Sequence, residues 1–444
     1  MNMYNKLIFM LLILMLIACQ DEKSDGDLDD QLRTQLIEVS QGEGLSYFEL
    51  PSSNDFARIP QDPNNRITEA KVDLGRLLYH ETGLGINPKY PEGQFTYSCA
   101  SCHHANAGFQ AGLRQGIGEG GDGYGFRGET RVPNAHYSVD SLDVQPIRTP
   151  TAMNGAYQTN MLWNGQFGAT GVNVGTEEAW TEGTPKAVNH LGYEGLEIQA
   201  IAGLTVHRMG IGDNVKNSAY GDYFENAFPG LTDEDLMTKE TAGLAIAAYE
   251  RTLLANNAPF QRWLKGNHDA MFRSEKRGAI LFFGKAGCAN CHTGPALNQM
   301  SFYSLGMPDL VGPGIYGSSD DNSAHLGRGS FTGRAEDDYK FKVPQLYNLR
   351  DSPFYGHGGT FRSVKEVIEY KNEGVPVNSK VPSDQISGNF YPLGLTQQEI
   401  QQITDFVENA LYDDNLIRYE PNVLPSGLCF PNNDDRSRED RGCN

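Results

Sequence analysis

The sequence predicts a mainly α-helical protein of two similar domains, with long loops and few strands. Three observations support this fold class. The chain has 444 residues, which is too many for one ordinary hydrophobic core. A helical pattern followed by a Cys-x-x-Cys-His motif and then by loops occurs twice, ending at His103 and at His292. Alternating patterns typical of strands are sparse, and the 50 glycines indicate extended loops.

Helical spacing of apolar residues and capping signals place the expected helices. Thr68 is the expected N-cap of the first, and Thr396 with Glu399 forms a capping box before the last. The expected helices are 67–80, 195–209, 238–254, 274–283, 363–370 and 396–411. The stretch 108–128 is so rich in Gly that we expect a loop there.

The chain begins with a leader typical of exported proteins. Lys6 precedes an apolar run, 7–17, that is too short to span a bilayer as a helix. The run ends in Leu-Ile-Ala-Cys19, which resembles the lipobox of bacterial lipoproteins. This predicts lipidation at Cys19 and a bacterial periplasmic or cell-envelope location, anchored to a membrane by lipid alone. An ordinary signal with an incidental cysteine is the alternative. The acidic segment from Asp21 to about Asp30 is expected to be a flexible tether.

The formal charge of −20 limits the kinds of partner. It argues against nucleic acid and against anionic lipid surfaces, and it suits a small basic protein. Simple solubility would also explain the charge.

The cysteines divide into groups without remainder. Cys99, Cys102 and His103 form one Cys-x-x-Cys-His motif, and Cys288, Cys291 and His292 form the other. In such a motif the two thiols bond covalently to a haem, and the His is its proximal iron ligand. A zinc or thioredoxin-like site is the alternative, but neither requires the adjacent His. We therefore expect two covalently bound haem c groups. Cys429 and Cys443 remain, and in an oxidising compartment they predict a disulfide.

These features predict five regions, with two cytochrome c-like haem domains at the centre. The domain boundary is expected between Asn256 and Ser274. The regions are a signal peptide (1–18), a lipidated acidic tether (19–60), an N-terminal haem domain (61–262), a C-terminal haem domain (263–425) and a disulfide-closed tail (426–444).

An ordered set of motifs extends across most of the mature chain. It consists of LGRLLYHETGLG (74–85), SCASCH (98–103), TPTAMNGAYQTNMLWNGQ (149–166), GLEIQA (195–200), GCANCHTGPAL (287–297), FKVPQLYNL (341–349) and SPFYGHGG (352–359). Over roughly 66–411 the chain resembles the bacterial di-haem cytochrome c peroxidases and the related MauG-like enzymes.

The resemblance implies a division of labour between the haems. The haem of His103 would be peroxidatic, reducing hydrogen peroxide to water. The haem of His292 would accept electrons from a small, basic, cytochrome-type donor. Trp163 matches the Trp that lies between the haems in the family and would assist electron transfer. An ordinary core Trp is the alternative.

The distal side of the peroxidatic haem departs from the family pattern. The family has a Pro and then a Glu-Met pair after this element, whereas here Gly203 replaces the Pro and Arg208 precedes the Met. Cleaving peroxide needs an acid/base and a positive group. We therefore predict His207 as acid/base and Arg208 as the polarising group, with Glu197 and Gln199 as alternates. Consecutive helical residues point about 100° apart, so both can face the haem only if the backbone there is irregular.

Two further positions differ from the classical peroxidases. Tyr370 stands where they place a Met ligand of the C-terminal haem, as in the MauG-like enzymes, so we predict that Tyr370 binds this iron. Met300 and Met307 are the fallback ligands, and a packed, unligated Tyr is the alternative. Arg148 replaces an Asn that binds calcium in the family, so its cation is expected in place of calcium, with bound calcium as the alternative.

Three functions remain open at this stage. The first is a cytochrome-c peroxidase, an oxidoreductase acting on peroxide. The second is a MauG-like enzyme that oxidises a residue of a partner protein, which Tyr370 favours. The third is a non-enzymatic di-haem electron carrier. A homodimer is left open.

Overall fold

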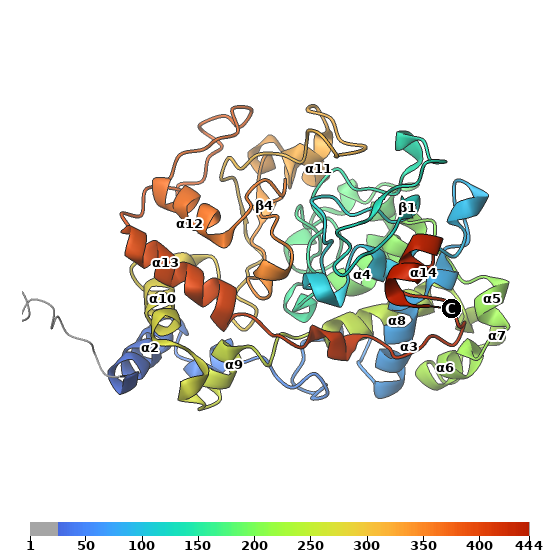
Figure 1. The fold of residues 1–444 in the computed structure, drawn as a ribbon, viewed down its shortest axis with the longest axis horizontal. Coiled ribbons are helices and arrows are strands. Elements are labelled where there is room, and N and C mark those ends of the chain that lie inside the picture. The colour runs from blue at the N-terminus through green and yellow to red at the C-terminus, as the bar shows by residue number, and fades with distance from the viewer. Residues whose placement is uncertain (1–24, 444) are drawn as a thin grey trace, which may run out of the picture.

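The computed structural model describes residues 25–443 and is elongated, with two helical halves side by side (Figure 1). The α-helices are α2 (Asp25–Val39), α3 (Glu69–His80), α4 (Gly195–Val206), α5 (Asp213–Lys216), α6 (Tyr220–Ala227), α7 (Asp233–Leu236), α8 (Lys239–Arg251), α9 (Pro259–Leu264), α10 (Arg273–Phe283), α11 (Gly329–Thr332), α12 (Val364–Glu373), α13 (Gln397–Asp405) and α14 (Asp435–Arg441). Among the described residues, the strands form two small antiparallel sheets, β1 (Gly121–Asp122) with β2 (Val132–Pro133) and β3 (Phe302–Tyr303) with β4 (Phe341–Lys342). The predicted mainly α fold is confirmed.

Each half contains a pair of helices that cross at a glycine. In one half α3 packs on α8, and in the other α10 packs on α13. A Cβ atom added to Gly75 of α3 would lie 1.9 Å from the carbonyl oxygen of Ala245, and one added to Gly278 of α10 would lie 1.9 Å from that of Gln402. Only glycine allows backbones to approach so closely. The helix before each Cys-x-x-Cys-His motif is therefore held in the same way, by a close crossing with a helix that follows the motif.

Local capping explains where the expected helices begin. The Thr68 side chain accepts a hydrogen bond from the Lys71 N–H at the start of α3, and Thr396 forms a capping box with Glu399 at the start of α13. After α13 the chain continues as a π-helical turn, Phe406–Ala410. The glycine-rich stretch 108–128 is irregular apart from β1.

The expectation of a flexible tether up to about Asp30 is wrong from Asp25 onward, because these residues form α2. Leu28, Leu32 and Leu36 form a buried stripe on α2, which packs against α10. Asp29 accepts a hydrogen bond from the Trp263 indole at 2.7 Å and pairs with Lys276 at 2.8 Å. The apolar stripe supplies the burial that a tether would lack.

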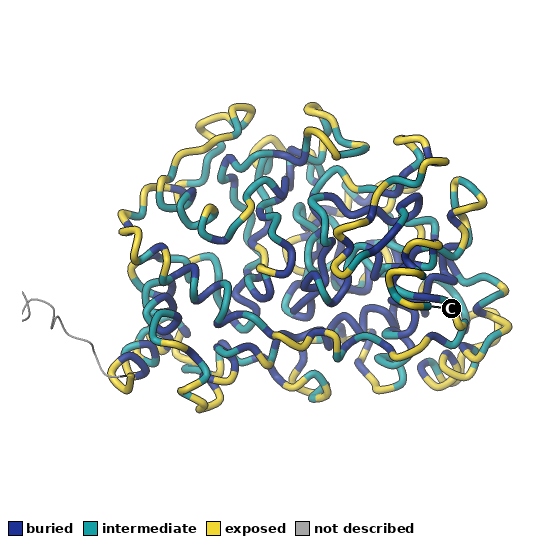
Figure 2. Tube along the Cα trace, viewed as in Figure 1, coloured by how far each residue is buried: buried dark blue, intermediate teal, exposed yellow. Residues whose placement is uncertain are grey.

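The C-terminal tail runs from one half of the molecule to the other (Figure 1). Residues after α13 run along one face to the half that contains α3 and α8, where α14 lies beside β1 (Figure 1). Cys429 and Cys443 form a disulfide with Cα atoms 5.9 Å apart. Asp434 pairs with the buried Arg131 at 3.2 Å. Buried segments run through the middle of both halves, and exposed residues lie mainly in the outer loops (Figure 2).

The leader falls outside the part of the chain that the structure describes, and so does Cys19. Within residues 25–443, every helix is too short or too polar to cross a membrane.

Candidate haem and peroxide sites

Both Cys-x-x-Cys-His motifs form tight turns that orient their histidines alike. In the first, His103 N–H bonds to the Cys99 carbonyl at 3.1 Å, and in the second, His292 N–H bonds to the Cys288 carbonyl at 2.9 Å. The Nδ1 atom of His103 lies 3.3 Å from the Phe109 carbonyl, and that of His292 lies 3.0 Å from the Leu297 carbonyl. An Nδ1 proton donated to a carbonyl leaves Nε2 free to bind iron.

The electrostatics of these motifs favour haem attachment over a thiolate metal site. The four motif cysteines are free of disulfides. Burial raises the pKa of Cys99, Cys102 and Cys288 to about 12, which opposes thiolate formation. Burial also lowers the pKa of His103 and His292 to about 4, which keeps both rings neutral. Within residues 25–443 no group of three or more His, Cys, Asp or Glu side chains could hold a metal ion. The zinc alternative is therefore not supported.

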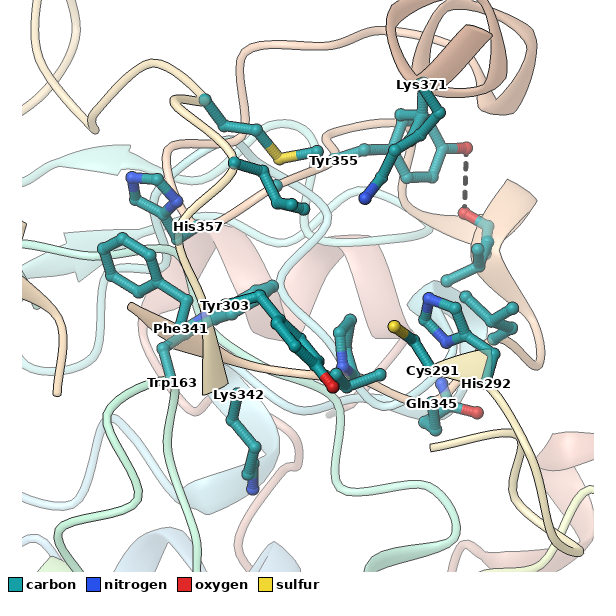
Figure 3. Close-up of a pocket in the computed structure, with 18 of the residues that line it drawn as sticks. Trp163, Cys291, His292, Tyr303, Phe341, Lys342, Gln345, Tyr355, His357 and Lys371 are labelled. Carbon is teal, nitrogen blue, oxygen red and sulfur yellow. Dashed lines mark hydrogen bonds between the residues drawn. The ribbon is translucent and has the colours of Figure 1, made fainter. Parts of the chain in front are cut away.

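A cavity of about 310 Å³ surrounds the second motif, and Cys291, His292, Trp163 and Lys371 lie around it (Figure 3). This size falls within the roughly 300–1,000 Å³ of cofactor sites. Most of the lining is apolar.

The charged side chains of this cavity fit a haem, whose two propionates are anionic. Arg148, Lys342, Lys371 and a single carboxylate, Asp309, line it. Lys342 is buried and donates to Gln158 Oε1 and to the Asn160 carbonyl at 2.6 Å, with no carboxylate of the described residues in ion-pair range. Burial lowers the pKa of Lys342 to about 7. Buried cations of this kind are stabilised by a nearby anion.

The predicted acid/base, His207, is held by a buried carboxylate that sequence reasoning missed. His207 Nδ1 lies 2.8 Å from Asp143 Oδ2. Asp143 is buried, whereas the His207 side chain is 37% exposed. Burial alone would lower the pKa of His207, but the Asp143 charge and hydrogen bond raise it. The charge of His207 influences His103, and that of Asp143 influences Cys102, so this pair lies beside the first motif.

Arg208 faces the same region because the backbone after α4 is irregular. The helix ends at Val206, and Arg208 has a φ of 57°. The Met209 N–H bonds to the Leu204 carbonyl at 2.7 Å, which closes the helix in a turn that usually has Gly at this position. Arg208 Nε donates to Glu119, a fully buried carboxylate that also accepts from the Tyr137 hydroxyl at 2.8 Å. The irregularity needed for His207 and Arg208 to act together is present.

The two alternates occupy different faces of α4. Glu197 is fully buried and pairs with Arg251 of α8 at 2.7 Å, away from His207. Gln199 precedes His207 by two turns on the same face, with Gly203 between them. The structure therefore leaves Gln199, and not Glu197, on the side of His207.

Trp163 lines the cavity around the second motif and is linked through the backbone to the first motif. Its indole Nε1 donates to the Arg148 carbonyl at 2.8 Å. Pro150 follows Arg148 by two residues, and its backbone lies close enough to the His103 ring to act on the pKa of that ring. The Lys342 N–H in turn bonds to the Trp163 carbonyl at 2.8 Å.

Of the two candidate ligands, Met307 lines the cavity around the second motif, whereas Tyr370 packs against Phe361 and Phe390 outside that lining. The buried Tyr370 hydroxyl donates to the carbonyl of Leu305, a lining residue, and burial raises its pKa to about 12. Met307 lines the cavity directly, and so does Lys371, the residue after Tyr370.

Several known proteins are similar to this chain. The family model described as di-haem cytochrome c peroxidase matches residues 69–269. Cytochrome-c peroxidase IdrP1 of Denitromonas iodatirespirans is 28% identical, covering 84% of this chain and 90% of its own length. Methylamine utilization protein MauG of Methylorubrum extorquens is also 28% identical, covering 79% and 80%.

A solved structure supports the fold. It is described as a MauG-like protein associated with microbial copper homeostasis, and it superposes with a TM-score of 0.57 at 23% identity, over 83% of this chain and 96% of that one. Together with the two haem-binding motifs, these matches show that the chain is similar to the di-haem cytochrome c peroxidases over most of its length and carries two covalently bound haem c groups.

Proposed function

We propose that this oxidoreductase reduces hydrogen peroxide to water at the haem held by His103. A small cytochrome-type donor delivers the electrons to the haem held by His292, and Trp163 assists their passage between the two. The observation that supports the peroxide site is the His207–Asp143 pair, 2.8 Å apart, with Arg208 next to it and the first motif close by.

The chain's own residues supply proton transfer and charge stabilisation. When bound, the first haem supplies an iron that binds peroxide and passes two electrons to it. His207 Nε2 would take a proton from one peroxide oxygen and return it to the oxygen that leaves as water. The Arg208 guanidinium stabilises the negative charge that develops as the O–O bond breaks. Two electrons and two protons convert one peroxide into two waters.

Rapid mixing of the ferric protein with peroxide tests this assignment. We expect His207→Ala to slow the reaction about 10²–10⁴-fold, the usual contribution of a general acid/base. His136→Ala is the matched control, because His136 is exposed in a nearby loop, and it should react at the wild-type rate. Equal rates for His207→Ala and wild type would exclude His207 as the acid/base.

A MauG-like activity is the second candidate, and Tyr370 favours it. An anionic phenolate ligand stabilises oxidised iron, which suits an enzyme that stores oxidising equivalents for a partner protein. Fast turnover with a reduced basic cytochrome supports the peroxidase. Slow turnover with oxidation of a Trp or Tyr in a partner supports the alternative. Two ferric irons that are both six-coordinate and inert to peroxide would leave only an electron carrier.

The remaining assignments follow from the sequence. The net charge of −20 supports a basic electron donor. A lipid at Cys19 would hold the protein in the bacterial cell envelope, with haem domains at 61–262 and 263–425.

A further inference from the structure

Two buried carboxylates, Glu119 and Asp143, lie side by side behind the proposed peroxide site. The Gly118 N–H bonds to the Asp143 carbonyl at 2.8 Å, and the Asp143 N–H bonds to the Glu119 carbonyl at 3.0 Å. These bonds fix the two segments in one register. A Cβ atom on Gly118 would lie 2.4 Å from Asp143 Oδ2, so a glycine is required beside this carboxylate.

Asp143 determines which nitrogen of His207 is available. Both Asp143 oxygens lie within hydrogen-bond distance of His207 Nδ1, at 2.8 and 3.0 Å. A carboxylate accepts only, so the proton stays on Nδ1 and Nε2 keeps its lone pair. A carboxylate that orients an imidazole in this way also stabilises the imidazolium formed when Nε2 takes a proton.

Glu119 performs the equivalent task for Arg208. It binds the guanidinium through Nε, while Arg208 Nη2 donates to the Ser141 carbonyl at 3.2 Å. The Arg208 carbonyl accepts from the Asn87 N–H and from the Tyr97 hydroxyl, both at 3.2 Å. These contacts hold Arg208 in a left-handed conformation that residues other than glycine rarely adopt.

In the pairs His207–Asp143 and Arg208–Glu119, the carboxylate is much more deeply buried than its partner. Glu119 and Asp143 are 0% and 6% exposed, whereas Arg208 and His207 are 22% and 37% exposed. The carboxylates therefore lie on the buried side of each pair, and the imidazole and the guanidinium are the accessible groups beside the first haem motif. The pair Arg251–Glu197 differs, because both of its side chains are fully buried.

We propose that Asp143 and Glu119 are positioning residues of the peroxide site. Asp143 holds the His207 ring with Nε2 toward the substrate, and Glu119 holds the Arg208 guanidinium beside it. This inference rests on the proposed function. Each carboxylate would act through the side chain it binds, Asp143 through His207 and Glu119 through Arg208.

Asp143→Asn tests the inference with little change in shape. The amide can donate to Nδ1 and so move the ring proton to Nε2, where it blocks proton uptake. We expect the peroxide reaction to slow at least 10-fold, while the absorption spectrum stays close to wild type and the melting temperature falls no further than in the control below. Glu119→Gln should slow the same step through Arg208.

Fluoride binding to the ferric first haem gives a readout without turnover. The affinity for fluoride should fall in both variants as the distal donors move.

Asp413→Asn is the matched control. Asp413 is fully buried and pairs with the 27% exposed Arg418 at 2.7 Å, in the segment after α13. This variant should lose stability while its fluoride affinity and peroxide rate stay at wild-type values.

The outcomes separate the two proposals. A slow His207→Ala with wild-type Asp143→Asn and Glu119→Gln would overturn the positioning roles and leave the proposed function intact. A wild-type rate for His207→Ala would overturn both. Equal losses in Asp413→Asn and Asp143→Asn would reduce the carboxylates to a general structural role.

Discussion

At the residue scale, the protein places its chemistry on side chains whose partners are distant in sequence. His207 and Arg208 are recognisable because Arg208 stands beside the Met of a known motif. Their carboxylate partners lie 64 and 89 residues away, Glu119 within the glycine-rich stretch 108–128 and Asp143 beyond it, and no sequence pattern marks either one. The sequence could therefore suggest His207 and Arg208 as candidates for the acid/base and the polarising group, but it could not point to Asp143 or Glu119. The left-handed backbone of Arg208 was equally hidden, since that position usually belongs to Gly.

The ligand of the second haem is also decided at a single residue. We expect Tyr370→Phe to convert this haem from low spin to high spin, because the substitution removes only the phenol oxygen that would bind iron. Electron paramagnetic resonance of the ferric protein measures the change. Met307→Leu is the control and should leave the spectrum unchanged. The reverse result would assign the position to Met307.

At the element scale, helices with strong caps and a clear apolar stripe were predictable, and those held by tertiary contacts were not. Thr68 and Thr396 correctly marked the starts of α3 and α13. The α2 helix was missed because its acidic residues suggested a tether. Its Leu28, Leu32 and Leu36 stripe was the available signal, and an acidic first turn is favourable at a helix N-terminus.

The glycine crossings give a prediction for the helix pairs. Gly75→Ala and Gly278→Ala should each destabilise the protein by about 2–3 kcal/mol, since the new methyl group would overlap a backbone carbonyl. Gly221→Ala in α6 is the control. Its Cβ would meet no atom within 4 Å, so it should stabilise slightly, by about 0.5 kcal/mol, through helix propensity. Thermal unfolding of the haem-loaded protein measures all three, and equal melting temperatures would contradict the close crossing.

At the scale of the whole molecule, Arg148 joins the two halves through a set of neutral acceptors. Its guanidinium donates to the carbonyls of Leu113 and Phe354 at 2.6 and 2.8 Å, and its backbone N–H bonds to the His357 carbonyl at 2.9 Å. Arg148 is almost fully buried, and within the described chain it has no ion-paired carboxylate. Carbonyl oxygens are also the ligands that calcium prefers, so the guanidinium occupies the kind of site a cation would use.

Calcium removal should therefore have little effect. We expect a chelator to leave the peroxide rate and melting temperature unchanged, because the cation between the halves is part of the chain. Arg148→Met should lower the melting temperature, since it leaves several buried carbonyls without a donor. Calorimetry with and without added calcium checks both statements, and a large loss of stability on chelation alone would show that calcium is still bound.

The path of the C-terminal tail has a consequence for how the protein matures. The tail closes over the first haem motif, where the Ser98 hydroxyl donates to the Pro431 carbonyl and the Thr82 hydroxyl to that of Cys429. Synthesis proceeds from the N-terminus, so Cys99 and Cys102 emerge more than three hundred residues before this cover exists. The first motif is thus uncovered while the rest of the chain is being made. The last cysteine pair can close only after the final residues arrive, which makes sealing the first haem one of the latest events in assembly.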